Sequence, residues 1–84
     1  MWQQGYENDP SFHMIERRYF KLCISTRTKK GVYEGRVCTW NVFINFYLWN
    51  YGYVQINNAF VGTLEEAKQY AENELNKIKE DLLT

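Results

Sequence analysis

Few side chains in this sequence could act as nucleophiles, general bases or metal ligands. The chain of 84 residues has two cysteines, Cys23 and Cys38, and one histidine, His13. Nucleophilic catalysis needs a Ser, Cys or Thr beside a base that a third group orients, and His13 stands in the least regular part of the sequence, between Phe12 and Met14. Zinc needs about four ligands, which two cysteines and one histidine do not provide. The sequence therefore predicts no catalytic residue and no metal site.

Acidic residues and glycines are not arranged for catalysis either. Six of the ten acidic residues lie within residues 64–84, where they are expected to form the solvated side of a helix, and only Glu34 falls within the predicted sheet. No GxGxxG or GxxxxGK[ST] sequence is present to bind phosphate groups. We therefore expect a protein that is not an enzyme, with no cofactor and no small-molecule substrate.

Aromatic residues give the strongest indication of a binding surface. They make up 18% of the chain, and seven of them lie within residues 40–53. Exposed apolar surface usually marks an interface, and Tyr and Trp are the commonest hot-spot residues. The residues that we predict to bind a protein partner or a second copy of the chain are Phe43, Tyr47, Trp49 and Tyr53. In an alternative arrangement, residues 1–17 fold over these side chains and extend the core.

A second candidate surface is basic. Residues 17–36 contain seven Lys and Arg residues against Glu34 alone, within a chain whose net charge is zero. Cations and aromatic rings on one sheet bind single-stranded nucleic acids, because bases stack on the rings and cations follow the phosphates. The residues predicted for such a surface are Tyr19, Lys21, Arg27, Arg36 and Trp40. Binding of RNA or single-stranded nucleic acid is therefore the alternative function, although no RNP-type sequence is present.

Alternating apolar residues predict a first β-hairpin. Its strands are Tyr19–Arg27 and Val32–Trp40, joined through the turn residues Lys29-Lys30-Gly31. A two-residue Lys30-Gly31 loop would place Arg27 opposite Glu34, Ile24 opposite Val37 and Cys23 opposite Cys38. In that register the two cysteines are either reduced thiols or a strained, reducible cross-strand disulfide.

A second hairpin is predicted from Val42–Trp49 and the strand that follows Gly52. The loop Asn50-Tyr51-Gly52 would pair Leu48 with Val54 and Phe46 with Ile56. A buried helix over Asn41–Asn50 is the competing interpretation. The sequence leaves open whether Trp40-Asn41 forms a tight turn or lies within one long strand.

The segment after Gly62 predicts a helix from Leu64 to about Leu82. Thr63-Leu64-Glu65-Glu66 is a capping box, in which the hydroxyl and the carboxylate each accept a free backbone N–H. Apolar residues then recur at spacings of three and four and form one stripe; they are Leu64, Ala67, Ala71, Leu75, Ile78 and Leu82. At the other end, residues 1–17 are expected to be a loosely ordered segment, a short helix over Pro10–Arg17 that Asp9 caps, or an extended lead-in.

These elements predict an α+β fold in residues 18–84. A small antiparallel sheet of about four strands carries one C-terminal amphipathic helix on one face. The predicted core of the sheet consists of Phe20, Leu22, Ile24, Val37, Ile44, Phe46, Val54 and Ile56. The sequence shows no internal repeat and no linker, so a single domain is expected.

Composition excludes several classes of protein. Apolar residues make up 45% of the chain, which is too many for a disordered protein, and no apolar run approaches the length of a transmembrane helix. The first residues lack the basic and apolar regions of a signal peptide. We expect a cytoplasmic, non-enzymatic interaction protein, such as the accessory and inhibitor proteins that phages and mobile elements encode. Its expected partner is a protein or a second copy of the chain, not a membrane.

Overall fold

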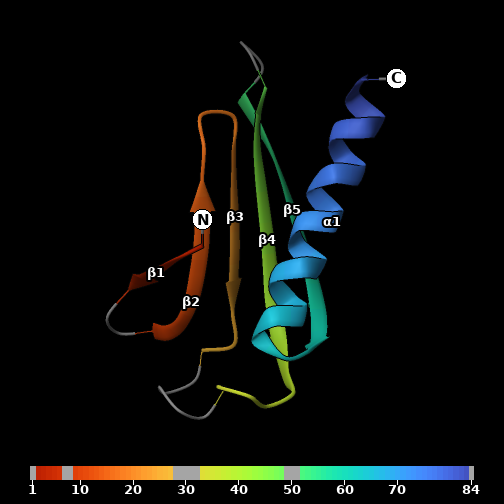
Figure 1. Cartoon of the computed structure of the whole chain (residues 1–84). Coiled ribbons are helices and arrows are strands. Elements are labelled where there is room, and N and C mark those ends of the chain that lie inside the picture. Colours follow the sequence, from red (N-terminus) through yellow and green to blue (C-terminus); the bar gives the residue numbers. More distant parts are fainter. Residues whose placement is uncertain (1, 7–8, 28–32, 49–51, 84) are drawn as a thin grey trace.

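Five antiparallel strands and one helix make up the fold in the computed structural model, which describes residues 2–6, 9–27, 33–48 and 52–83 (Figure 1). The strands are β1 (Gln3–Tyr6), β2 (Asp9–Glu16), β3 (Phe20–Ser25), β4 (Cys38–Leu48) and β5 (Gly52–Gly62), and the helix is α1 (Leu64–Leu83). Each strand pairs with the next one along the chain, so the sheet order is β1-β2-β3-β4-β5. The predicted α+β fold with an antiparallel sheet and a C-terminal helix is confirmed, with five strands instead of about four.

The N-terminal residues lie in the sheet and extend it. β2 pairs with β3, with Ile15 opposite Leu22, and β1 pairs with β2. The predicted short helix over Pro10–Arg17 is therefore wrong, and the extended alternative is the one that forms. Pairing with β3 buries Ile15 and satisfies the backbone of the segment, which outweighs the local helix-start signal of Asp9-Pro10.

β4 is one long strand that runs through Trp40 and Asn41 without a turn. β3 pairs with its central part, so that Leu22 lies opposite Ile44. The predicted register is wrong, and the predicted strand Val32–Trp40 is correct only for Cys38–Trp40, which belong to β4, because residues 33–36 form turns and bends. Val32 and the loop residues Lys29-Lys30-Gly31 lie outside the described residues. The predicted register would have set Leu22 opposite Thr39, whereas the observed register matches three apolar pairs: Phe20 with Phe46, Leu22 with Ile44, and Ile24 with Val42.

The two cysteines do not face each other in the sheet. Cys23 pairs with Phe43, and Cys38 pairs with Gly62 at the start of β4. Both are free thiols. The predicted pairing of Cys23 with Cys38 is wrong because it depended on the register of the first hairpin.

The second hairpin forms in a register two residues away from the predicted one. Leu48 pairs with Gly52 where a pairing with Val54 was predicted, and β4 and β5 then pair without interruption to Cys38 and Gly62. The competing helix over Asn41–Asn50 does not form. The observed register sets Ile44 opposite Ile56 and aligns further apolar residues along the strands. A shift of two residues keeps every side chain on its predicted face.

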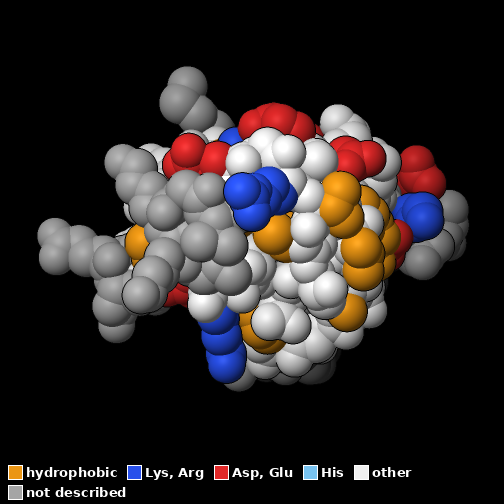
Figure 2. All heavy atoms as spheres, turned by 90° about the horizontal axis from the view of Figure 1, so that it is seen from below, with side chains coloured by type: hydrophobic (Ala, Val, Ile, Leu, Met, Phe, Trp, Pro, Cys, Tyr) orange, Lys and Arg blue, Asp and Glu red, His pale blue; other side chains and the backbone are white. Residues whose placement is uncertain are grey.

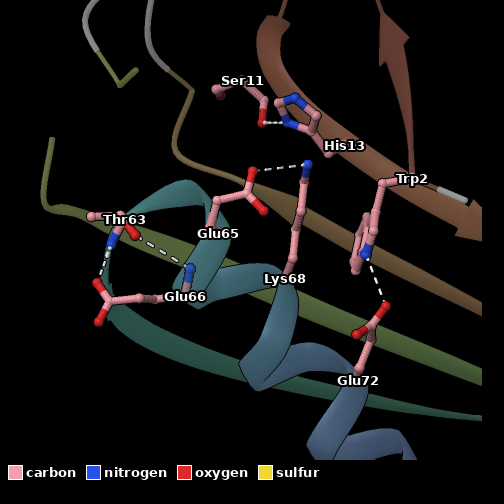
Figure 3. Close-up of polar contacts among 8 residues, drawn as sticks. All are labelled: Trp2, Ser11, His13, Thr63, Glu65, Glu66, Lys68 and Glu72. Atoms are coloured by element: carbon pink, nitrogen blue, oxygen red, sulfur yellow. Dashed lines mark hydrogen bonds and ion pairs between the residues drawn. The ribbon is translucent and has the colours of Figure 1, made fainter. Parts of the chain in front are cut away.

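The helix begins at the predicted capping box and seals one face of the sheet. The Thr63 N–H donates to Glu66 Oε1 at 2.9 Å, and the Glu66 N–H donates to Thr63 Oγ1 at 3.3 Å (Figure 3). The apolar stripe then packs on β3, β4 and β5, with Ala67, Ala71 and Leu75 buried. Two residues of the predicted core are instead exposed, Val37 at 66% and Val54 at 43%.

Aromatic side chains complete the core beside the helix. Trp40 is fully buried, and its Nε1 donates to the carbonyl oxygen of Gly62 at 2.9 Å. Tyr33 packs edge-on against Trp40, with ring centroids 5.9 Å apart. Trp2 Nε1 donates to Glu72 Oε1 of α1 at 3.1 Å, which ties the N-terminal segment to the helix (Figure 3). These aromatic contacts lie on the helix side of the sheet.

The close approach of α1 to the sheet gives a first prediction. Ala71 is fully buried, so the extra carbons of Ala71→Leu would push the helix away and lower the free energy of unfolding by about 1–3 kcal/mol. Gln69→Leu, at an exposed position of the same helix, is the control for helix propensity. Chemical denaturation of both variants measures the effect, and equal stability of the two would contradict the packing described here.

Candidate protein-interaction surface

The face of the sheet opposite α1 is the surface that we call the helix-free face. Side chains alternate along each strand, so the residues between the buried core positions point to this side. From β2 and β3 they are Phe12, Met14, Glu16, Lys21 and Cys23; from β4 they are Thr39, Asn41, Phe43, Asn45 and Tyr47; from β5 they are Gln55, Asn57, Ala59 and Val61. No helix among the described residues covers them (Figure 1).

Two of the four predicted partner-binding residues are placed on the helix-free face. Phe43 is half-buried and Tyr47 is 42% exposed. The backbone of Tyr53 pairs opposite Tyr47, but its side chain lies outside the described residues, as does the whole of Trp49. The structure thus brings Phe43 and Tyr47 together on one strand and one face.

Apolar side chains from β2 enlarge this surface, and sequence reasoning missed them. Met14, Cys23 and Phe43 are consecutive neighbours across β2, β3 and β4. Phe12 lies over β1, where a Cβ atom at Gly5 would stand 2.4 Å from its ring. The signal that predicts this arrangement is the alternation along Asp9–Glu16. Described residues of the N-terminal segment therefore widen the helix-free face and do not fold over it.

The thiol of Cys23 lies in the middle of this apolar row. It is 5% exposed, and burial raises the pKa of the thiol, an effect that the nearby Lys21 charge opposes and the Glu16 charge reinforces. A protonated, buried thiol is a poor nucleophile. Cys23 therefore acts here as a small apolar side chain.

The helix-free face carries little charge. Residues 37–64 contain no Lys, Arg, Asp or Glu, and this run spans all of β4 and β5. The charged side chains that the described strands place on this face are Lys21 and Glu16, and Lys21 Nζ lies 3.8 Å from Glu16 Oε2.

Figure 2 looks at the end of the molecule where β4 begins and β5 ends, and it shows hydrophobic side chains gathered along one flank. Val37 and Val61, each 66% exposed, belong to this end of the sheet.

One polar atom on the helix-free face has no hydrogen-bond partner among the described residues. Asn45 Oδ1 is buried, and Asn45 lies between Lys21 and Gln55 in the sheet. Burying an acceptor without a donor costs about 1–3 kcal/mol.

The residues predicted for nucleic-acid binding do not form one surface. Trp40 is fully buried on the helix side, so its ring cannot stack on a base. Tyr19 is 51% exposed in the turn before β3, beside Arg18, whose guanidinium lies 5.4 Å from the ring centre. Arg27 follows the other end of β3, beyond Ser25, which lies about 13 Å from Lys21 at the rise of an extended strand. Arg36 is exposed in the turn that precedes β4.

A cluster of Ser, Asp and His side chains at the end of β3 has the residue types of a hydrolase but a different geometry. Ser11 Oγ and Ser25 Oγ each donate to the Asp9 carboxylate at 2.6 Å. His13 Nδ1 lies 2.8 Å from the backbone carbonyl oxygen of Ser11, so its hydrogen-bond partner is a carbonyl and not a serine hydroxyl. The Ser25 hydroxyl also accepts the N–H of Arg27 at 3.1 Å, where the backbone has a φ of 57°. The cluster therefore fixes the backbone turn that ends β3.

The described residues hold no cluster of metal-ligating side chains and no membrane-spanning helix. No three His, Cys, Asp or Glu side chains gather within residues 2–6, 9–27, 33–48 and 52–83 as metal ligands would. In the same residues, α1 is too polar to cross a membrane. No family model, curated protein or solved structure matches the chain.

The Asp9 cluster predicts a pH dependence of stability. Burial would raise the pKa of the Asp9 carboxyl, but hydrogen bonds from Ser11 and Ser25 and the charge of Arg27 outweigh burial and lower the pKa below its ordinary 3.8. A lowered pKa stabilises the fold above the ordinary value, and that contribution is lost as the pH falls through the folded-state pKa. Asp9→Asn should cost about 1–3 kcal/mol near pH 7.

The difference between wild type and Asp9→Asn should narrow as the pH falls below 3.8. Urea denaturation of both proteins across this range measures it. Glu34→Gln, an exposed acid in the turn before β4, is the control. A difference that is independent of pH would contradict the role given to the Asp9 carboxylate.

Proposed function

We propose that the protein is a non-enzymatic module that binds another protein through its helix-free face. The observation that carries the proposal is an aromatic, nearly charge-free sheet surface that no helix among the described residues covers. Phe43 and Tyr47 are the anchors of this surface. Such modules act as accessory proteins or inhibitors by occupying a surface of a larger protein.

The composition of the face supports a protein partner. The core of a protein interface is rich in aromatic residues and Met and poor in charge, and its rim is polar. Phe43, Met14 and Cys23 form such an apolar centre, and the exposed amides of Asn41 in β4 and Asn57 in β5 lie beside it. The matching surface on the partner is apolar and without net charge.

Nucleic-acid binding is supported less well by the same residues. Affinity for phosphates comes from clustered cations, whereas residues 37–64 are uncharged. Lys21 Nζ forms an ion pair with Glu16 Oε2 at 3.8 Å, and the ring of Trp40 is buried. Among the described residues, the exposed Tyr19 beside Arg18 is a place where a base could stack on a ring next to a cation.

Substitution of Tyr47 tests the proposed function. Full-length protein is used to isolate its partner from the native host, and the affinity for the purified partner is then measured by calorimetry. Tyr47→Ala should weaken binding at least about 30-fold, as expected for a hot-spot residue. Val54→Ala removes an apolar side chain of similar exposure, 43% against 42%, from the helix side of β5 and should leave the affinity unchanged.

Circular dichroism establishes that Tyr47→Ala and Val54→Ala both fold. Recovery of no protein, or equal affinities of the two variants, would contradict the proposal.

Single-stranded oligonucleotides test the alternative. At about 50 mM salt, where phosphate contacts are strong, we expect no binding of DNA or RNA to the full chain. Fluorescence anisotropy measures it. Binding that weakens with salt and is lost in Tyr19→Ala would instead establish the nucleic-acid function.

A further inference from the structure

The two edges of the sheet differ in length and regularity. β1 has 4 residues, and its register with β2 shifts between Gln4 and Tyr6. β5 has 11 residues and pairs with β4 without a bulge from Gly52 to Gly62. A long, regular edge strand presents a row of backbone N–H and C=O groups that can pair with another strand. β5 is therefore the edge suited to strand addition.

β5 also lacks the features that protect edge strands. Natural edges are blocked by charged side chains, above all Lys, by Pro or by bulges. None of the 11 residues of β5 is charged or a proline. α1 packs on β5 at the helix side of the sheet, where Phe60 stacks on Tyr70 with ring centroids 4.6 Å apart. In the described sheet β5 pairs with β4 alone.

The chemistry of β5 suits a second copy of the same strand. In a two-fold symmetric dimer, the same edge strand of each molecule lies against the other, so a charged side chain would lie close to a charge of the same sign. An uncharged strand avoids this repulsion, and amide side chains serve as both donors and acceptors toward an identical strand. Gln55, Asn57 and Ala59 are exposed along β5, and Val61 at its end is 66% exposed. An antiparallel pairing centred on Asn57 would place Gln55 of one copy opposite Ala59 of the other.

We infer that β5 is a dimerisation edge, at which two copies of the chain pair antiparallel and join their five-stranded sheets into one continuous sheet. The backbone supplies the hydrogen bonds, and the uncharged side chains set no like charges together. The inference goes beyond the proposed function, because it concerns the edge of the sheet and leaves the helix-free face open for a different protein. A dimer then presents two helix-free faces on the same side of the joined sheet.

Paired lysine substitutions separate the edge from the face. Gln55→Lys with Ala59→Lys puts two cations on β5. In the dimer, position 55 of one copy lies opposite position 59 of the other, so the new cations would face each other between the two β5 strands. The matched control, Thr39→Lys with Asn41→Lys, puts two cations on the same face of β4, an interior strand of the sheet. All four positions are exposed, and Asn41 pairs with Ala59. Sedimentation equilibrium over a concentration series gives the mass and the dissociation constant of each full-length protein.

The wild type should reach twice the monomer mass of 10.2 kDa. The dissociation constant of the β5 variant should be at least about tenfold higher, because two pairs of like charges face each other across the strands. The β4 variant and Tyr47→Ala should keep the wild-type dissociation constant. Hydrogen exchange of the wild type should show protection of β5 amides that rises with concentration and no such rise in β1. This measurement remains decisive if a variant fails to fold.

A wild type that stays monomeric, or β5 amides whose protection is independent of concentration, would overturn the inference. Equal dissociation of the β4 variant would also overturn it and would place self-association on the helix-free face. Loss of partner binding in Tyr47→Ala with an intact dimer supports both proposals, and an intact dimer with no bound partner contradicts only the proposed function.

Discussion

A single helix has to seal a sheet of five strands, and the rest of the structure follows from that mismatch in width. A helix with its side chains is about 10–12 Å across, whereas five strands spaced by about 4.8 Å extend over about 19 Å. α1 packs on β3, β4 and β5. Its approach depends on the small side chains of Ala67 and Ala71, which are fully buried against the sheet.

The part of the sheet that α1 does not reach is completed by side chains from elsewhere. Tyr33 packs against Trp40, and Trp2 crosses from the N-terminal segment to Glu72. Ser11, Ser25 and Asp9 fix the end of β3 with hydrogen bonds in place of apolar packing. Because the single helix packs on one side of the sheet, Phe43 and Tyr47 on the opposite side stay partly accessible to solvent. The same shortage of covering elements thus produces both the mixed core and the proposed binding surface.

Local signals in the sequence predicted the helix closely, because everything that defines it lies within a few residues. The capping box at Thr63 and Glu66 and the stripe through Ala67 and Ala71 require no knowledge of the rest of the chain. The face of each residue in β4 was also predictable, since alternation alone assigns Phe43 and Tyr47 to one side.

Strand register could not be predicted in the same way. Leu22 lies opposite Ile44 because three apolar pairs form together, and such a match compares distant segments. The turn residues Lys29-Lys30-Gly31 predicted a short hairpin loop, whereas the connection between β3 and β4 runs from Ser25 to Cys38. For the candidate surface, the misplaced residue was Trp40: the first hairpin assigned it to a basic face, whereas its position in β4 turns it into the core.

The sheet order has a consequence for synthesis of the protein. Each strand lies beside the one made before it, so the sheet can grow in the order in which the ribosome delivers it. The helix that seals the core follows all five strands. Until α1 has emerged, a nascent chain presents Leu22, Ile24 and Ile44 to solvent, together with the edge of β5. In that interval the apolar helix side of the sheet lacks its cover, and the risk of pairing with a wrong strand is greatest.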